Sequence, residues 1–171
     1  MEDQQPKIGK FSLNYGLILG GLGVAFGLML FSMDAHVGGD SSVQQIIGIV
    51  LMVAVIFMGI FNFRKANANS LTIGQDLKLG AGIAVVAAVI SVIYTYLLAN
   101  VLDPEFAVKT AEIAKTALEE RGDIPQEQIQ QQYQGTIDYF WIAYPFILII
   151  NTILGLVVGL VGGLIFKKSQ A

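Results

Sequence analysis

Charged residues leave four long stretches of this sequence without Asp, Glu, Lys or Arg. The stretches contain 23, 23, 24 and 28 residues and run from Phe11 to Met33, Ser41 to Phe63, Leu79 to Leu102 and Tyr139 to Phe166. An α-helix rises ~1.5 Å per residue, so each stretch can cross a hydrocarbon core of ~30 Å. The pattern predicts an all-α membrane protein with four transmembrane helices, at about residues 13–33, 43–63, 79–101 and 142–166.

Residues 103–138 form the one sizeable polar connection between these stretches. The segment opens on an Asp-Pro pair, which is typical of a helix start, and Gly122 suits a helix stop. Ile129 and Tyr133 then repeat at helical spacing on one face of a second helix. The sequence therefore predicts an extramembrane helical hairpin between the third and fourth transmembrane helices, within a single domain of residues 1–171.

The composition agrees with a membrane protein and narrows its chemistry. Of 171 residues, 54% are hydrophobic and 13% are charged, against about 25% charged in an ordinary soluble domain. The chain has no Cys, which excludes disulfides, thiol catalysis and thiolate metal sites. Asp34, His36 and Asp40 are too few ligands to predict a metal centre, so no metal or cofactor is expected.

The basic residues divide unequally between the two sides of the predicted membrane domain. Seven of the ten lie in the two tails and the connection 64–78, which also carry three acidic residues, for a net charge of +4. The connections 34–40 and 103–138 carry three basic and ten acidic residues, for a net charge of −7. Because basic flanks stay in the cytoplasm, we expect both termini to be cytoplasmic and the acidic connections to face outward.

Small residues recur at helical spacing in three of the four apolar stretches. They are Gly16, Gly20, Gly23 and Gly27 in the first, Gly80, Ala84, Ala87 and Ser91 in the third, and Gly155, Gly159 and Gly162 in the fourth. Such stripes let helix backbones approach closely in a membrane. They favour packing within one bundle over a homodimer contact, and the bulkier second stretch is expected to pack more loosely or at the periphery.

The apolar stretches contain no Asp, Glu, Lys, Arg or His, which disfavours a proton- or ion-coupled transporter. Asn151 is the deepest strongly polar side chain. An interhelical hydrogen bond is its favoured role, and contact with a transported solute is the alternative. No nucleotide-binding, hydrolase or zinc-protease motif is present, and no basic aromatic face indicates nucleic acid.

Three sequence motifs resemble those of a known family of four-helix membrane domains, which is uncharacterised in function and common in some Gram-negative bacteria. They are KFSLNYG at residues 10–16, GIFNFRK at residues 59–65 and LTIGQDLKLG at residues 71–80. The resemblance covers nearly the whole chain. It implies a location in the bacterial inner membrane and contributes no catalytic residues.

Taken together, these features favour a non-enzymatic accessory or assembly subunit that acts through protein association. Its partner would be a membrane or periplasmic protein or a second copy of the chain. The candidate partner-binding residues are the apolar positions of the predicted hairpin: Phe106, Ile113, Leu118, Ile129 and Tyr133. The alternative is a small permease or channel for a neutral or lipidic solute. A membrane enzyme is less favoured, because Asp34, His36 and Asp138 are its only outer acid–base candidates.

Overall fold

The computed structural model describes residues 6–38, 41–68 and 70–166, and these form helices with no strand among them. The long helices are α1 (Ile8–Ser32), α2 (Ser41–Ala66), α3 (Ile73–Leu97) and α6 (Ala143–Phe166). A π-helix, η1 (Leu98–Leu102), extends α3, and a short 3₁₀ helix, η2 (Phe140–Ile142), precedes α6. Two shorter helices, α4 (Phe106–Arg121) and α5 (Gln126–Asp138), lie between them. Asp40, Lys167 and Lys168 lie outside the described residues.

Four helices are long and apolar enough to cross a membrane, as the sequence predicts. They are Ile8–Ser32, Ser42–Ala66, Ile73–Leu102 and Phe140–Phe166. The first and third begin at Ile8 and Ile73, earlier than the predicted residues 13 and 79. Both extensions carry charged residues, and the predicted spans are set to exclude charge. The helices start earlier because an α-helix accommodates Lys and Asp in its end turns outside the bilayer core.

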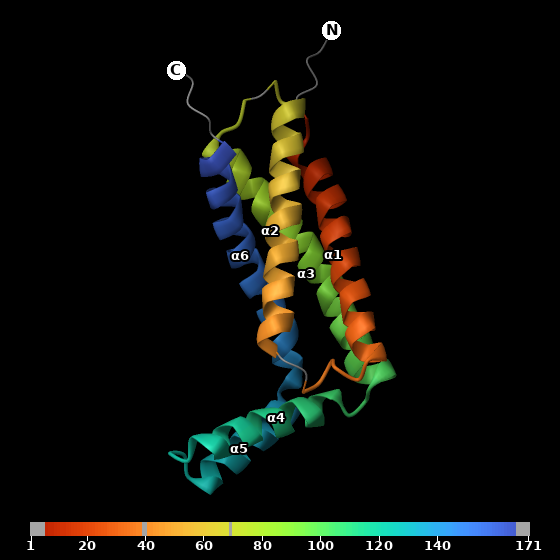
Figure 1. Cartoon of the computed structure of the whole chain (residues 1–171), viewed down its shortest axis with the longest axis vertical. Coiled ribbons are helices and arrows are strands. Elements are labelled where there is room, and N and C mark those ends of the chain that lie inside the picture. Colours follow the sequence, from red (N-terminus) through yellow and green to blue (C-terminus); the bar gives the residue numbers. More distant parts are fainter. Residues whose placement is uncertain (1–5, 39–40, 69, 167–171) are drawn as a thin grey trace.

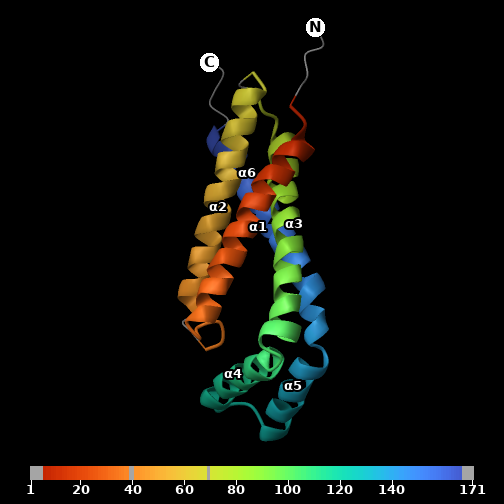
Figure 2. The same ribbon diagram turned by 90° about the vertical axis from the view of Figure 1, so that its right-hand side faces the viewer.

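The four long helices form an elongated bundle, and α1 begins at the same end of it at which α6 stops (Figure 1). We call this the terminal end. The helices α4 and α5 lie side by side at the opposite end, crossing below the bundle (Figure 2). Gly122 joins them in a left-handed conformation with φ 69°, which ends α4 where the sequence predicts a helix stop. We call this unit the α4–α5 pair.

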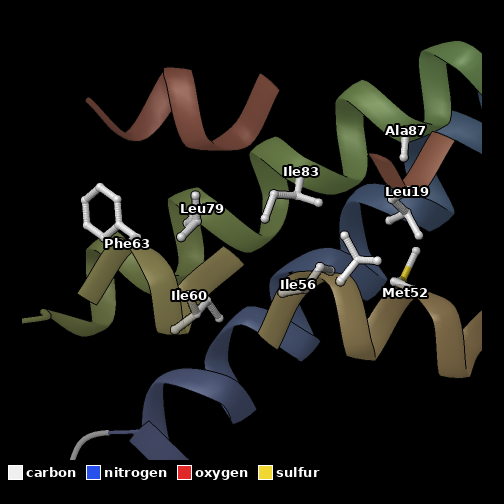
Figure 3. Close-up of a cluster of buried hydrophobic side chains, with 9 residues drawn as sticks. Leu19, Met52, Ile56, Ile60, Phe63, Leu79, Ile83 and Ala87 are labelled. Atoms are coloured by element: carbon white, nitrogen blue, oxygen red, sulfur yellow. The ribbon is translucent and has the colours of Figure 1, made fainter. Parts of the chain in front are cut away.

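The main apolar core lies toward the terminal end. Figure 3 shows its side chains converging from α1, α2 and α3. The members are Leu19, Met52, Val55, Ile56, Ile60, Phe63, Leu79, Ile83 and Ala87. The helix α2 supplies five of these nine residues, but it approaches its neighbours at far fewer positions than α3 approaches α1 and α6, so the prediction that it packs more loosely is confirmed. It packs through large side chains, whereas α3 approaches both α1 and α6 at small residues.

The other half of α2 has few contacts with the bundle. Ile46, Ile49 and Val50 expose 60%, 53% and 59% of their surface, and a Cβ added at Gly48 would meet no atom within 4 Å. These residues lie on several faces of the helix. The bundle is therefore tightly packed at its terminal end and open around the first turns of α2.

Candidate functional site

The α4–α5 pair is attached to the bundle by a polar cluster of His36, Asp103 and Lys109, which we call the Asp103 cluster. The ammonium group of Lys109 donates to both carboxylate oxygens of Asp103, at 2.9 and 2.8 Å. Nε2 of His36 donates to Oδ2 of Asp103 at 3.0 Å. Only 7% of Asp103 is exposed, so its carboxylate is stabilised mainly by the hydrogen bonds of these partners.

These interactions join distant parts of the chain. His36 lies in the connection after α1, Asp103 directly follows η1, and Lys109 lies in the first turn of α4. The backbone N–H of Glu105 also donates to Oδ1 of Asp103, at 3.3 Å. Asp103 thus caps the turn that leads into α4, although the helix begins at Phe106, later than the Asp-Pro pair predicts.

The electrostatics of Asp103 follow from these partners. The hydrogen bonds from Lys109 and His36 lower the pKa of the Asp103 carboxyl below its ordinary value. The same hydrogen bond raises the pKa of the Lys109 ammonium group. Both groups therefore stay charged at neutral pH, and the cluster is suited to holding α4 in place.

Aromatic rings surround the cluster. The imidazole ring of His36 lies 4.9 Å from the ring of Phe31 and 6.2 Å from that of Phe106, measured between centroids. Phe106 also makes an edge contact with Phe140, at 5.8 Å. These contacts bring α1, α4 and η2 together at one point. Phe106, predicted to bind a partner, is instead half-buried in this internal contact.

The other candidate partner-binding residues divide between the inside and the outside of the α4–α5 pair. Ile129 is 1% exposed between α4 and α5, and Leu118 and Tyr133 are half-buried. The ring of Tyr133 also lies 5.6 Å from the ammonium nitrogen of Lys115 across the pair. Only Ile113, at 45%, is well exposed. The predicted apolar faces are therefore largely used to hold the two helices together.

The outward surface of α5 consists mainly of glutamine. Six are exposed, at positions Gln126, Gln128, Gln130, Gln131, Gln132 and Gln134. We call this surface the glutamine face. It carries many amide donors and acceptors and little charge, since Glu127 and Asp138 are the only ionisable side chains of α5 apart from Tyr133.

The small-residue stripes lie mostly at contacts between helices. Along α1, Gly16 faces Val86, Gly20 faces Ile90 and Gly27 faces the ring of Tyr94. Gly23 differs, because an added Cβ would meet no atom within 4 Å. Sequence spacing alone placed Gly23 on the same face. No side chain of α3 covers Gly23, whereas the long side chain of Tyr94 reaches Gly27 one turn further on.

The closest approach in the bundle is between α3 and α6. A Cβ added at Gly80 would lie 2.7 Å from the Cα of Gly159, and one at Gly155 would overlap the Cβ of Ala84. Gly162 faces α2 instead, where Ile60 and Phe57 cover it. Ala87 is buried in the apolar core and Ser91 is half-buried. At the contact between α3 and α6 the two backbones pack directly against each other, so a side chain at Gly80 has no room.

Residues 14–168 match the model of a family described as a protein of unknown function (DUF4199). The chain belongs to this family. No curated protein and no solved structure gives a significant match to it. The match supports the resemblance to an uncharacterised family over most of the chain, and the four apolar helices indicate that this DUF4199 chain is a multi-pass membrane protein.

A buried carboxylate lies near the terminal end of this DUF4199 bundle. Asp76, in the first turn of α3, is 1% exposed, and its Oδ1 has no hydrogen-bond partner among the described residues. It packs on Gly163 of α6, where an added Cβ would lie 2.8 Å from the Asp76 Cγ. The charge pattern of the sequence assigns Asp76 to a polar connection and does not predict its burial. The available signal was that Asp76 lies four residues before Gly80, on the same face of α3.

The remaining polar candidates do not come together. The side-chain amide of Asn151 donates to the Ile147 carbonyl of its own helix, at 2.8 Å, so the interhelical bond expected for it is not seen. Asp138 accepts from Gln134 at the end of α5, while His36 is held by Asp103. No three His, Asp or Glu side chains lie close enough to share a metal ion in the part of the chain that the structure describes.

Proposed function

We propose that this DUF4199 chain is a non-enzymatic accessory or assembly subunit of the bacterial inner membrane that acts through protein association. The observation that carries the proposal is an attached α4–α5 pair that turns a glutamine-rich polar face outward. The Asp103 cluster and the Phe106 contacts fix the pair to the bundle. A partner bound to the glutamine face would therefore be held in a defined position relative to the membrane.

The chemistry of the glutamine face supports binding to a protein. Charged residues are depleted from the centres of protein interfaces, because their desolvation is costly. Neutral amides lose less on desolvation and can donate and accept at once, which allows them to pair with the backbone or side chains of a partner. Gln131 lies opposite the buried Ile129 on α5 and is the natural centre of such a contact.

Photocrosslinking from Gln131 tests the association. A benzophenone amino acid at this position in native membranes is expected to yield one discrete protein adduct. The same group at Leu164, which is 57% exposed on the lipid-facing side of α6, is expected to yield none. An adduct near twice the chain mass of 18.4 kDa would identify the partner as a second copy. The absence of any adduct at Gln131, or the same adducts at both positions, would contradict the proposal.

The proposed orientation places both termini in the cytoplasm and the α4–α5 pair outside, on the strength of the basic residues in the tails and the connection 64–78. The chain has no natural Cys, so a single introduced cysteine is its only reactive thiol. In cells with a permeabilised outer membrane and an intact inner membrane, Gln130→Cys is expected to react with a membrane-impermeant maleimide. Asn67→Cys is expected not to react. Reaction of Asn67→Cys from outside would reverse the orientation.

One observation favours the alternative of a small permease for a neutral or lipidic solute. The first turns of α2 are exposed on several faces, so the bundle is open to the bilayer near its α4–α5 end. Such an opening could admit an apolar molecule from the lipid. The polar side chains at this opening are Ser42, Gln44 and Gln45 at the start of α2, and the Gln44 amide already donates to the Ala35 carbonyl at 2.8 Å. Association remains the better supported function.

A further inference from the structure

An open groove lies between the connection that follows α1 and one face of α4. Its volume is about 560 Å³. Val37 and Gly38 form one wall, and the other consists of Lys109, Glu112, Ile113, Thr116, Ala117 and Glu120. Figure 2 shows α4 passing below the ends of α1 and α2, which places this groove against the bundle. We call it the α4 groove.

The α4 residues of the groove form two adjacent rows along the helix, because residues four apart lie on one face. One row is Glu112, Thr116 and Glu120, and the other is Lys109, Ile113 and Ala117. The groove therefore has an apolar floor with carboxylates along one side and an ammonium group at one end.

The charges of the groove are not balanced within it. Lys109 is paired with Asp103 at 2.8 Å, and its side chain is still 40% exposed. Neither Glu112 nor Glu120 forms an ion pair with any of the residues that the structure describes. Both carboxylates are exposed and are therefore available to a cation, and the 45% exposed side chain of Ile113 is available for apolar contact.

The position of the groove determines which molecules of its surroundings can enter it. The apolar helices that flank it stop at Ser32 and resume at Ser42, so Val37 and Gly38 lie at the membrane boundary. Tyr139 and Trp141, each 60% exposed, mark the same boundary at the start of the fourth span. Lipid headgroups fill this layer, a few ångströms beyond the hydrocarbon core.

We infer that the α4 groove binds the headgroup of a zwitterionic phospholipid that carries a primary ammonium group, of the phosphatidylethanolamine type. Glu112 and Glu120 lie ~12 Å apart along the helix, so the ammonium group of one headgroup pairs with the carboxylate of Glu112, the one nearer to Lys109, and Glu120 adds to the negative charge of the groove. The phosphate lies toward Lys109, and the glycerol end covers Ile113 and Ala117. The inference is independent of the proposed partner, because it uses a face of α4 and not the glutamine face of α5.

Charge and hydrogen bonding set the specificity that this site should have. Phosphatidylglycerol carries no cation and would place its negative charge beside two carboxylates. Phosphatidylcholine has a cation without N–H donors, so it can balance the charge but cannot form the hydrogen bonds. The expected order of affinity is therefore phosphatidylethanolamine, then phosphatidylcholine, then phosphatidylglycerol.

Native mass spectrometry of the whole detergent-solubilised chain tests this order. The three lipids, with identical acyl chains, are titrated separately, and phosphatidylethanolamine is expected to bind about fivefold more tightly than phosphatidylglycerol, or ~1 kcal/mol. Glu112→Gln with Glu120→Gln should abolish this preference. The matched control, Glu119→Gln with Glu127→Gln, removes the same charge outside the groove and should retain it.

Three outcomes would overturn the inference. The first is equal binding of the three lipids to the wild type, and the second is equal loss of preference in both double variants. The third is a co-purifying protein or peptide that occupies the groove and is released by the Glu112 and Glu120 substitutions. Ala117→Trp fills the floor without changing charge, and it should also reduce phosphatidylethanolamine binding. Unchanged binding in that variant would place the lipid elsewhere.

Discussion

Replacing Gly80 with leucine is expected to destabilise the bundle more than any other single glycine substitution, by about 3 kcal/mol. A Cβ at this position would lie 2.7 Å from the Cα of Gly159 and closer still to the Gly155 carbonyl oxygen. Both are backbone atoms, so no rotamer change can relieve the overlap and α3 must move away from α6. Thermal unfolding in mild detergent, followed by the fluorescence of Trp141, measures the loss.

Gly23 provides a matched control for this prediction. It is also a member of a small-residue stripe in a membrane helix, but it faces open space. Gly23→Leu should be neutral, or slightly stabilising through a gain in helix propensity of up to ~1 kcal/mol. Gly20→Leu should fall between them, because a rotamer change can move the Cδ1 of Ile90 away but leaves its Cβ at 2.9 Å. Equal loss of stability in Gly80→Leu and Gly23→Leu would show that the α3–α6 contact is not the tightest in the bundle.

The four long helices could be predicted from the sequence because a bilayer imposes a one-dimensional rule. Charge is excluded over a fixed length, and that exclusion can be read directly from the chain. The helix ends could not be read in this way, because α3 continues through Lys78 and Asp76 to Ile73. Asp76 was missed for the same reason. Its charge assigned it to a connection, whereas its register with Gly80 places it inside the bundle.

Helical spacing predicts which residues share a face but not what covers that face. Gly20 and Gly23 lie on the same side of α1, and only Gly20 meets a neighbouring helix. In the same way, Phe106 and Ile129 were recognised as apolar positions of the connecting helices. Whether a partner or the chain itself covers them depends on how α4 and α5 fold against each other and the bundle, and the structure shows internal contacts for both.

The Asp103 cluster had no sequence signal of its own. His36 and Asp103 are 67 positions apart, and no motif links them. They meet because α1 and the α3–η1 segment end at the same level of the bundle. The α4 groove has the same origin, because Val37 reaches Ile113 only through this folding. Sites built from helix ends depend on helix length and crossing, which residue patterns do not encode locally.

Asp103→Ala is expected to release the α4–α5 pair from the bundle while the four spans stay folded. The substitution removes the acceptor for Lys109 and for the 10% exposed side chain of His36. Water can replace the acceptor for the half-exposed Lys109 but not for His36. We therefore expect the free energy that holds the α4–α5 pair on the bundle to fall by about 2 kcal/mol. Hydrogen–deuterium exchange measured by mass spectrometry should show faster exchange in α4 and in the connection 33–38.

Glu105→Ala is the control for this prediction, because it also removes a carboxylate near Lys109. Glu105 lies 3.9 Å from the Lys109 ammonium group and its side chain is 78% exposed, so its contribution is expected to be within ~0.5 kcal/mol of zero. Exchange in α4 should then match that of the wild type. If Asp103→Ala and Glu105→Ala give the same exchange in α4, the Phe106 contacts and not the Asp103 cluster hold the pair. If Asp103→Ala instead speeds exchange throughout the spans, attachment of the α4–α5 pair is part of the global stability of the bundle.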